Sequence, residues 1–110
     1  MDIRKIMNDT QYFLEMLNYK INDVMYDNGN IQYIVFSNED LIGQIITPRE
    51  DNKDMFIVRV EIKDNFDRFS NVAYEKYYNI EDFNMVAYEP ITLYRELMYI
   101  YYEWYAEALD

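Results

Sequence analysis

The chain has 110 residues and a net charge of −11, and it is 51% hydrophobic and 18% aromatic, which is enough apolar material for one packed domain. It contains no cysteine and no histidine, which excludes disulfides, zinc fingers, thiol nucleophiles and histidine-based catalytic or metal sites. Its two glycines, Gly29 and Gly43, do not make a glycine-rich phosphate-binding loop.

The first predicted element is an amphipathic helix over about residues 2–18. Apolar residues and one threonine recur there at spacings of three and four, which places them on one helix face. They are Ile3, Ile6, Met7, Thr10, Phe13, Leu14, Leu17 and Ile21. We expect this face to pack in the core rather than to bind a partner.

The centre of the chain changes to the patterns of an antiparallel sheet. The turn-forming run at 27–30 contains Asn28 and Gly29, a pair that can supply the positive φ of a tight hairpin. The segment before it, 20–26, fits either a short strand or a continuation of the helix. β-Branched and aromatic residues then predict three strands, at 31–36, 41–47 and 55–63, with a turn at 38–40 and a polar loop at 49–54.

The segment 64–89 has no clear period. We expect a turn at 64–67, a strand or a helical turn at 72–78, and a strand or a loop at 80–89. Pro90 suits the first turn of a helix, and an apolar stripe after it predicts a final helix at 91–109. The stripe consists of Ile91, Tyr94, Leu97 or Met98, Tyr101, Trp104 or Tyr105, and Ala108.

Together these elements predict a single acidic domain of the α+β class over residues 1–110. We expect an N-terminal helix, an antiparallel sheet of three to five strands in meander order, and a C-terminal helix. The helices pack on the sheet or on each other. The short connections between the predicted strands are the reason for expecting the meander.

Acidic residues are the only chemically active side chains present in quantity, with Asp and Glu numbering 21 against 10 Lys and Arg. Adjacent pairs such as Glu39-Asp40 do not make an acid–base pair, because neighbours on a strand point to opposite faces and neighbours in turns point into water. The runs at 51–54 and 64–67 lack the spacing and the glycine of a calcium-binding loop, and we interpret them as solvated turns. We therefore expect no enzyme, no catalytic residue, no cofactor and no metal ion.

Negative charge concentrates toward the C-terminus, where 77–110 carry seven acidic residues against Arg95 alone, a net charge of −6. Three of these acids fall on one line of the final helix and form a predicted acidic ridge, which we expect to lie in solvent and to contribute little to stability. Tyrosine is also abundant, and several tyrosines between 94 and 105 have no obvious core role. Acids interleaved with tyrosines are typical of a protein interface. The ridge is Glu96, Glu103 and Glu107, and the full set of predicted partner-binding residues is Glu81, Asp82, Glu89, Glu96, Tyr99, Tyr102, Glu103 and Glu107.

The charge disfavours direct binding to nucleic acids and to anionic membranes, and it favours a basic protein partner such as a nucleic-acid-binding protein or a nuclease. In composition the chain is similar to the small acidic proteins with which phages and plasmids block restriction or CRISPR nucleases. We expect an inhibitor of that anti-CRISPR or anti-restriction type, acting by nucleic-acid mimicry. The alternatives are an immunity protein that neutralises a basic toxin, a self-associating structural or assembly protein, and acidity that serves solubility alone.

Two further expectations concern association and location. Tyr94, Met98, Tyr101, Tyr105 and Ala108 have a heptad-like spacing that allows a homodimer through the C-terminal helix. The chain has no apolar run near the roughly 18 residues of a membrane span, and its N-terminus has no secretory signal. We therefore expect a cytoplasmic protein, in the host cytoplasm if a phage encodes it.

Overall fold

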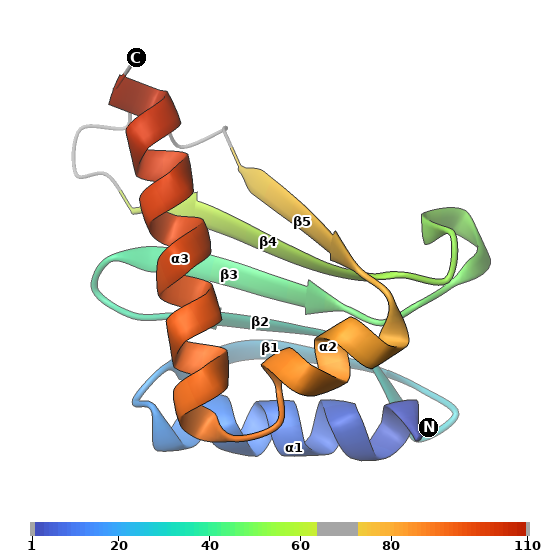
Figure 1. Cartoon of the computed structure of the whole chain (residues 1–110). Helices are drawn as coiled ribbons and strands as arrows, with labels where there is room; N and C mark the ends of the chain where they lie inside the picture. The colour runs from blue at the N-terminus through green and yellow to red at the C-terminus, as the bar shows by residue number, and fades with distance from the viewer. Residues whose placement is uncertain (1, 64–72, 110) are drawn as a thin grey trace.

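Figure 1 shows the computed structural model, which describes residues 2–63 and 73–109 and, within these, every side chain except those of 107–109. Three α-helices and five strands follow one another within these residues in the order α1, β1 to β5, α2 and α3. A short 3-10 helix, η1 at Glu50–Asn52, lies between β3 and β4. The predicted turn at 64–67 lies outside the described residues.

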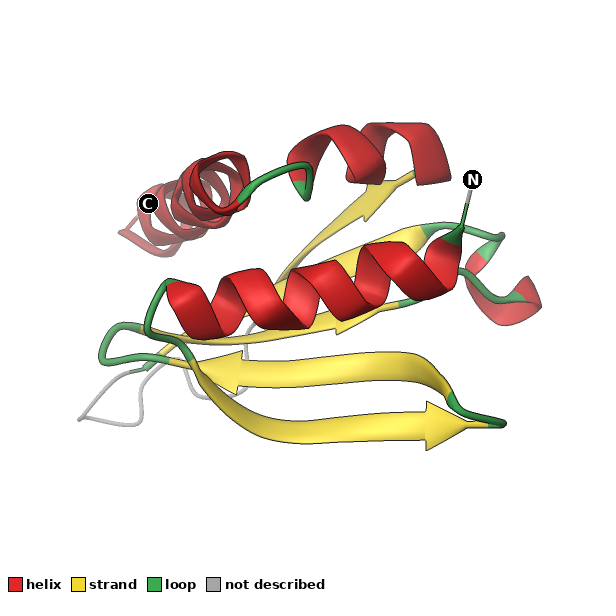
Figure 2. Cartoon of the chain, turned by 90° about the horizontal axis from the view of Figure 1, so that it is seen from below, coloured by secondary structure: helices red, strands yellow, loops and turns green. Residues whose placement is uncertain are grey.

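The strands form one antiparallel sheet in the order β1-β2-β3-β4-β5, so each strand pairs with its neighbour in the sequence. This arrangement confirms the predicted meander and the α+β class. Figure 2 shows the three α-helices on one face of the sheet, where α1 packs on β1 and β2, α3 packs on β4 and β5, and α1 meets α3. The strand bounds are Lys20–Asp27, Asn30–Ser37, Leu41–Ile46, Phe56–Ile62 and Tyr74–Tyr78.

The hairpin between β1 and β2 forms as the sequence predicts. The segment 20–26 is part of strand β1, so of its two interpretations the strand is correct. Asn28 has φ 51° and Gly29 has φ 78°, the left-handed conformations that a tight hairpin turn requires. The next turn also forms, because the Asn38 side chain accepts hydrogen bonds from the backbone amides of Asp40 and Leu41, at 2.8 and 3.0 Å.

Helix α1 spans Ile3–Met16, two residues shorter at its C-terminal end than predicted. The Asp2 side chain caps its first turn, and Asn18 adopts φ 67°, a left-handed conformation that stops a helix. The predicted face is in the core, which confirms that expectation. Its fully or nearly fully buried members are Ile6, Met7, Thr10 and Leu14.

The prediction of a strand or a loop at 80–89 is wrong, because Ile80–Val86 forms the short helix α2. The Asn79 side chain caps this helix by accepting a hydrogen bond from the Asp82 backbone amide at 2.7 Å. Phe83 is fully buried, and its ring stacks on Phe56 of β4 with the centroids 4.2 Å apart. A helix of 7 residues contains only about two turns, which is too short for the helical period to be recognised in the sequence.

Helix α3 spans Pro90–Leu109, and Pro90 occupies its first turn as predicted. The side that faces the core differs from the predicted stripe. Ile91 and Tyr94 belong to that stripe but are 47% and 39% exposed. Apolar and aromatic residues surround most of this helix, so its sequence period does not identify the inner side. The buried residues are Leu93, Leu97, Ile100 and Trp104.

Candidate functional site

The predicted partner-binding residues lie on two consecutive helices and on the turn between them (Figure 1). Glu81 and Asp82 are in the first turn of α2, and Glu89 immediately precedes α3. The side chain of Glu107 lies outside the part of the chain whose side chains are described. The remaining members follow along α3, and they are Glu96, Tyr99, Tyr102 and Glu103.

The acids on and after α2 are exposed. Glu81, Asp82 and Glu89 have no ion pair with any residue in 2–63 or 73–109. Acids in the first turn of a helix are favoured by the helix dipole, so Glu81 and Asp82 also stabilise α2 locally. The backbone of Glu89 is held by Thr92, whose Oγ1 donates to the Glu89 carbonyl at 2.9 Å. The backbone that carries these three carboxylates is therefore held in place, and their side chains are exposed to solvent.

Glu96 does not lie free in solvent, and this part of the acidic-ridge expectation is wrong. One of its carboxylate oxygens lies 2.9 Å from Nζ of Lys76 and accepts a hydrogen bond from the hydroxyl of Tyr78 at 2.7 Å. Both partners lie on strand β5, and the ion pair is partly buried. Glu96 therefore links α3 to the edge strand of the sheet. Its role is structural, whether or not it also contacts a partner.

The contact between Glu96, Lys76 and Tyr78 shifts the pKa values of the lysine and the tyrosine. The hydrogen bond to Glu96 raises the pKa of Lys76 above its ordinary value, and the nearby charge of Glu103 adds to the rise. Burial raises the pKa of the Tyr78 hydroxyl, and the hydrogen bond to Glu96 raises it further. Nζ of Lys76 also lies 5.4 Å from the centroid of the Tyr99 ring. The flank of α3 that carries Glu96 and Glu103 thus faces β5 and its single lysine.

The surplus of tyrosines is real on the surface. Tyr99 and Tyr102, which are three residues apart on α3, are 57% and 63% exposed. Tyr102 contacts the ring of Tyr101 edge-on, with the centroids 5.5 Å apart. These rings expose aromatic surface that the core does not need, as the sequence analysis expected.

Sequence reasoning missed three residues of this surface. Lys76 is the counter-ion of the ridge, and Met85 and Tyr88 are 72% and 74% exposed beside the acids of α2. The signal for Lys76 was its position as a lone cation shortly before an acidic region. Tyr88 belongs to the surplus of tyrosines in the sequence, but it is not among the predicted partner-binding residues, and Met85 gives no signal because its segment is not predicted as a helix.

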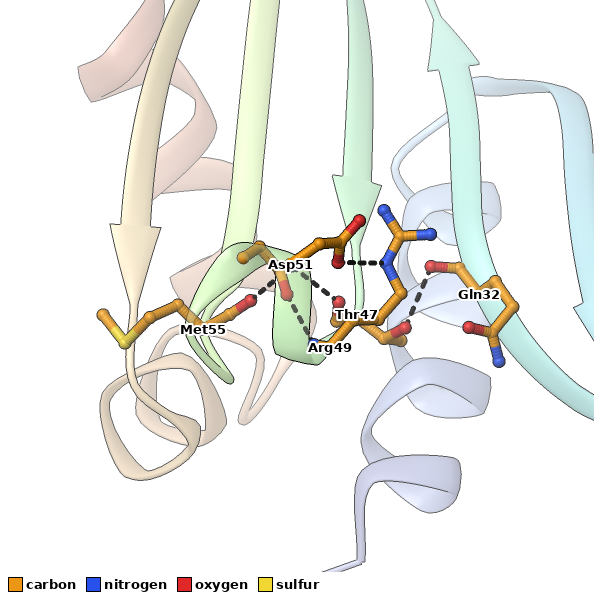
Figure 3. A network of polar contacts seen from close by, with 6 residues as sticks. Gln32, Thr47, Arg49, Asp51 and Met55 are labelled. Atoms are coloured by element: carbon orange, nitrogen blue, oxygen red, sulfur yellow. Dashed lines mark hydrogen bonds and ion pairs between the residues drawn. The ribbon is translucent and has the colours of Figure 1, made fainter.

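The loop at 49–54 is not only a solvated turn, because Asn52 is buried within it. Its amide donates to the backbone carbonyls of Thr47 at 3.0 Å and Met55 at 2.9 Å, and its carbonyl accepts from the Arg49 backbone amide. Figure 3 shows this network, in which the Asp51 carboxylate pairs with the Arg49 guanidinium. The acids of this loop therefore do not converge on one point as calcium ligands must.

Apart from the loop at 49–54, a cleft of about 460 Å³ is lined by two carboxylates, those of the sequence neighbours Glu39 and Asp40, together with the cations Lys20 and Lys63. A cleft of about 530 Å³ beside this loop contains Asp51 as its one carboxylate, next to the cations Arg49 and Lys53. Among the described residues there is also no group of three or more acids arranged to hold a metal ion. The exposed acids and tyrosines of α2 and α3 remain the candidate functional site.

No helix in the described part of the chain combines the length and the apolar character needed to cross a bilayer.

Comparisons with protein-family models, with curated proteins and with solved structures found no match.

Proposed function

We propose that this chain is a small acidic interaction protein that occupies the basic nucleic-acid-binding site of another protein. In this proposal the chain is a phage or mobile-element inhibitor of the anti-CRISPR or anti-restriction type. It acts in the host cytoplasm, and its target is a host defence nuclease. The observation that carries it is the set of exposed carboxylates at Glu81, Asp82 and Glu89, which have no ion pair among the described residues, beside the exposed ring of Tyr88.

Charge supports a basic target. The chain carries −11 overall, and among the acids of α2 and α3 whose side chains are described, Glu96 is the one that forms an ion pair, with Lys76. A surface with this excess attracts a positive groove over a distance of about 10 Å at 0.1 M salt, which accelerates association. The remaining acids can then meet Lys or Arg side chains of the groove through charge-assisted hydrogen bonds.

Tyrosine supports a protein as the target. Tyr88 and Tyr99 present amphipathic rings that lose little side-chain entropy on binding and that stack on guanidinium groups. Phosphates are repelled by the same surface, so we propose no direct contact with nucleic acid. A basic nuclease toxin offers a groove of the same chemistry, and the same experiment detects it as a target.

The experiment begins with affinity capture from host lysate at 50 mM and 500 mM NaCl. The captured protein is then titrated with a fluorescent DNA duplex in the presence of increasing amounts of this chain. The proposal predicts capture at low salt only, and displacement of the duplex by the acidic protein. A partner that binds the duplex and this chain at the same time, without competition, contradicts the proposal.

A further inference from the structure

The side of α3 that faces away from the core carries a row of four apolar or aromatic residues and one arginine. The row consists of Ile91, Arg95, Met98, Tyr102 and Tyr105, and we call it the outer seam. The residues are spaced four, three, four and three apart, which keeps them on one side of the helix. This spacing is typical of the contact line between two packed helices. Ile91, Tyr102 and Tyr105 are 47%, 63% and 46% exposed, and Met98 is half-buried.

The outer seam differs in charge from the rest of the surface. It contains no acid, and Arg95 is its one charged residue. Glu96 and Glu103 lie on the flank of α3 that faces Lys76 on β5. A basic groove therefore has nothing to pair with along the seam, whereas an apolar surface with a similar spacing does.

We propose that the outer seam packs against the outer seam of a second copy of this chain, with the two α3 helices antiparallel. A parallel pair sets Arg95 beside Arg95 of the second copy. An antiparallel pair with its two-fold axis near Met98 brings Arg95 to the level of Tyr102 of the second copy, where a cation–π contact forms. Ile91 then lies near the level of Tyr105 of the second copy. The proposal does not rest on the proposed function, because it uses no acidic residue.

The size of the seam indicates a weak dimer. The exposed parts of its two tyrosines and Ile91, with Tyr94 beside them, amount to on the order of 400 Å² in each copy, within the range of functional patches on monomers. Two copies bury roughly 800 Å², which is less than the roughly 1,200 Å² of a stable specific interface and corresponds to a weak, transient one. Each copy also carries −11, so the repulsion between copies decreases as salt is added.

Because the chain has no cysteine, single introduced cysteines test the register directly. Met98→Cys places two thiols near the two-fold axis, and mild oxidation is expected to link two copies. Ile91→Cys places them about 22 Å apart along the helix axis, which is too far for a disulfide. A mixture of Ile91→Cys and Tyr105→Cys is expected to give the mixed disulfide. Circular dichroism confirms that each variant is folded.

Sedimentation of the protein without cysteines gives the second readout. We expect dimer at high micromolar concentration, more of it in 500 mM than in 50 mM NaCl, and a dissociation constant raised about ten-fold by Tyr102→Asp. Tyr26→Asp is the matched control, since Tyr26 is 56% exposed on the distant strand β1, and it is expected to dimerise like the wild type. A wild type that stays monomeric at 500 mM NaCl, or self-linking by Ile91→Cys, overturns the proposal.

Discussion

Lys76 of β5 and Glu96 of α3 form an ion pair with 2.9 Å between Nζ and the carboxylate, and the Tyr78 hydroxyl donates to the same oxygen. The contact joins the last strand of the sheet to the last helix of the fold, twenty residues later in the chain. An acid that sequence spacing assigns to a binding ridge is therefore part of the fold. Substitutions at this position change stability as well as any binding.

The first prediction concerns this contact. Glu96→Gln keeps an acceptor for Tyr78 but removes the charge that faces Lys76, and we expect the free energy of unfolding to fall by about 1 kcal/mol. Glu81→Gln is the control, because Glu81 is exposed and has no ion pair among the described residues, and it is expected to change the value by about 0.5 kcal/mol or less. Urea titration at pH 7 measures both. Equal effects contradict a structural role for Glu96.

The second prediction concerns alkaline pH. The pKa of Tyr78 is raised by burial, so its hydroxyl stays protonated in the fold when the unfolded chain begins to ionise near pH 10.0. The pKa of Lys76 is also raised, by its hydrogen bond to Glu96. Both contributions are complete below pH 10 and are lost as pH rises above it. Urea titrations between pH 8 and 11.5 should show a smaller loss for Tyr78→Phe than for the wild type, and parallel curves contradict this.

Tyr19 leads to the third prediction. Its side chain is 5% exposed, its ring meets Phe36 edge-on with the centroids 5.3 Å apart, and its hydroxyl has no hydrogen-bond partner among the described residues. Burial raises the pKa of Tyr19 to about 12. Tyr19→Phe keeps the ring and removes the unpaired hydroxyl, so we expect the free energy of unfolding at pH 7 to rise by about 1 kcal/mol. A fall of similar size shows that the hydroxyl has a partner.

The fourth prediction concerns Gly43, which pairs with Phe36 across β2 and β3. A Cβ on Gly43 would overlap the fully buried Phe36 ring, so we expect Gly43→Ala to lower the free energy of unfolding by about 2–3 kcal/mol. Gly29→Ala is the comparison. A Cβ at this position meets no atom within 4 Å, but the backbone φ of 78° is unfavourable for alanine, so we expect the free energy of unfolding to fall by about 1 kcal/mol. Adding Phe36→Leu should recover part of the loss at Gly43 only.

Local signals were sufficient for much of the fold. The period of α1, the Asn28-Gly29 turn and the β-branched and aromatic residues of β4 each lie within a short stretch of sequence, and each predicted element forms, within two residues of its predicted bounds. Helix α2 was missed because its start depends on the Asn79 cap and its position on the burial of Phe83 against Phe56. Those are contacts of the folded state.

The surface was harder to predict than the fold. Glu96 and Glu103 do share one side of α3, but the direction in which that side points depends on which apolar residues enter the core. Leu93 and Ile100 are buried, and this turns Glu96 toward Lys76 and leaves Tyr102 in solvent. The spacing of residues within α3 does not predict this rotation of the helix, because packing against the sheet determines it.

The most direct measurement of the central claim compares two variants that differ only in where three negative charges are removed. One is Glu81→Gln, Asp82→Asn, Glu89→Gln, and the other is Glu15→Gln, Asp27→Asn, Glu39→Gln, all at exposed positions. Each is titrated at 50 mM and 200 mM NaCl against the protein captured from lysate. The account predicts that the first variant loses at least ten-fold in affinity and much of the salt dependence, while the second loses about two-fold. Equal losses would contradict it, and would mean that the acidity acts through net charge rather than through the surface of α2 and α3.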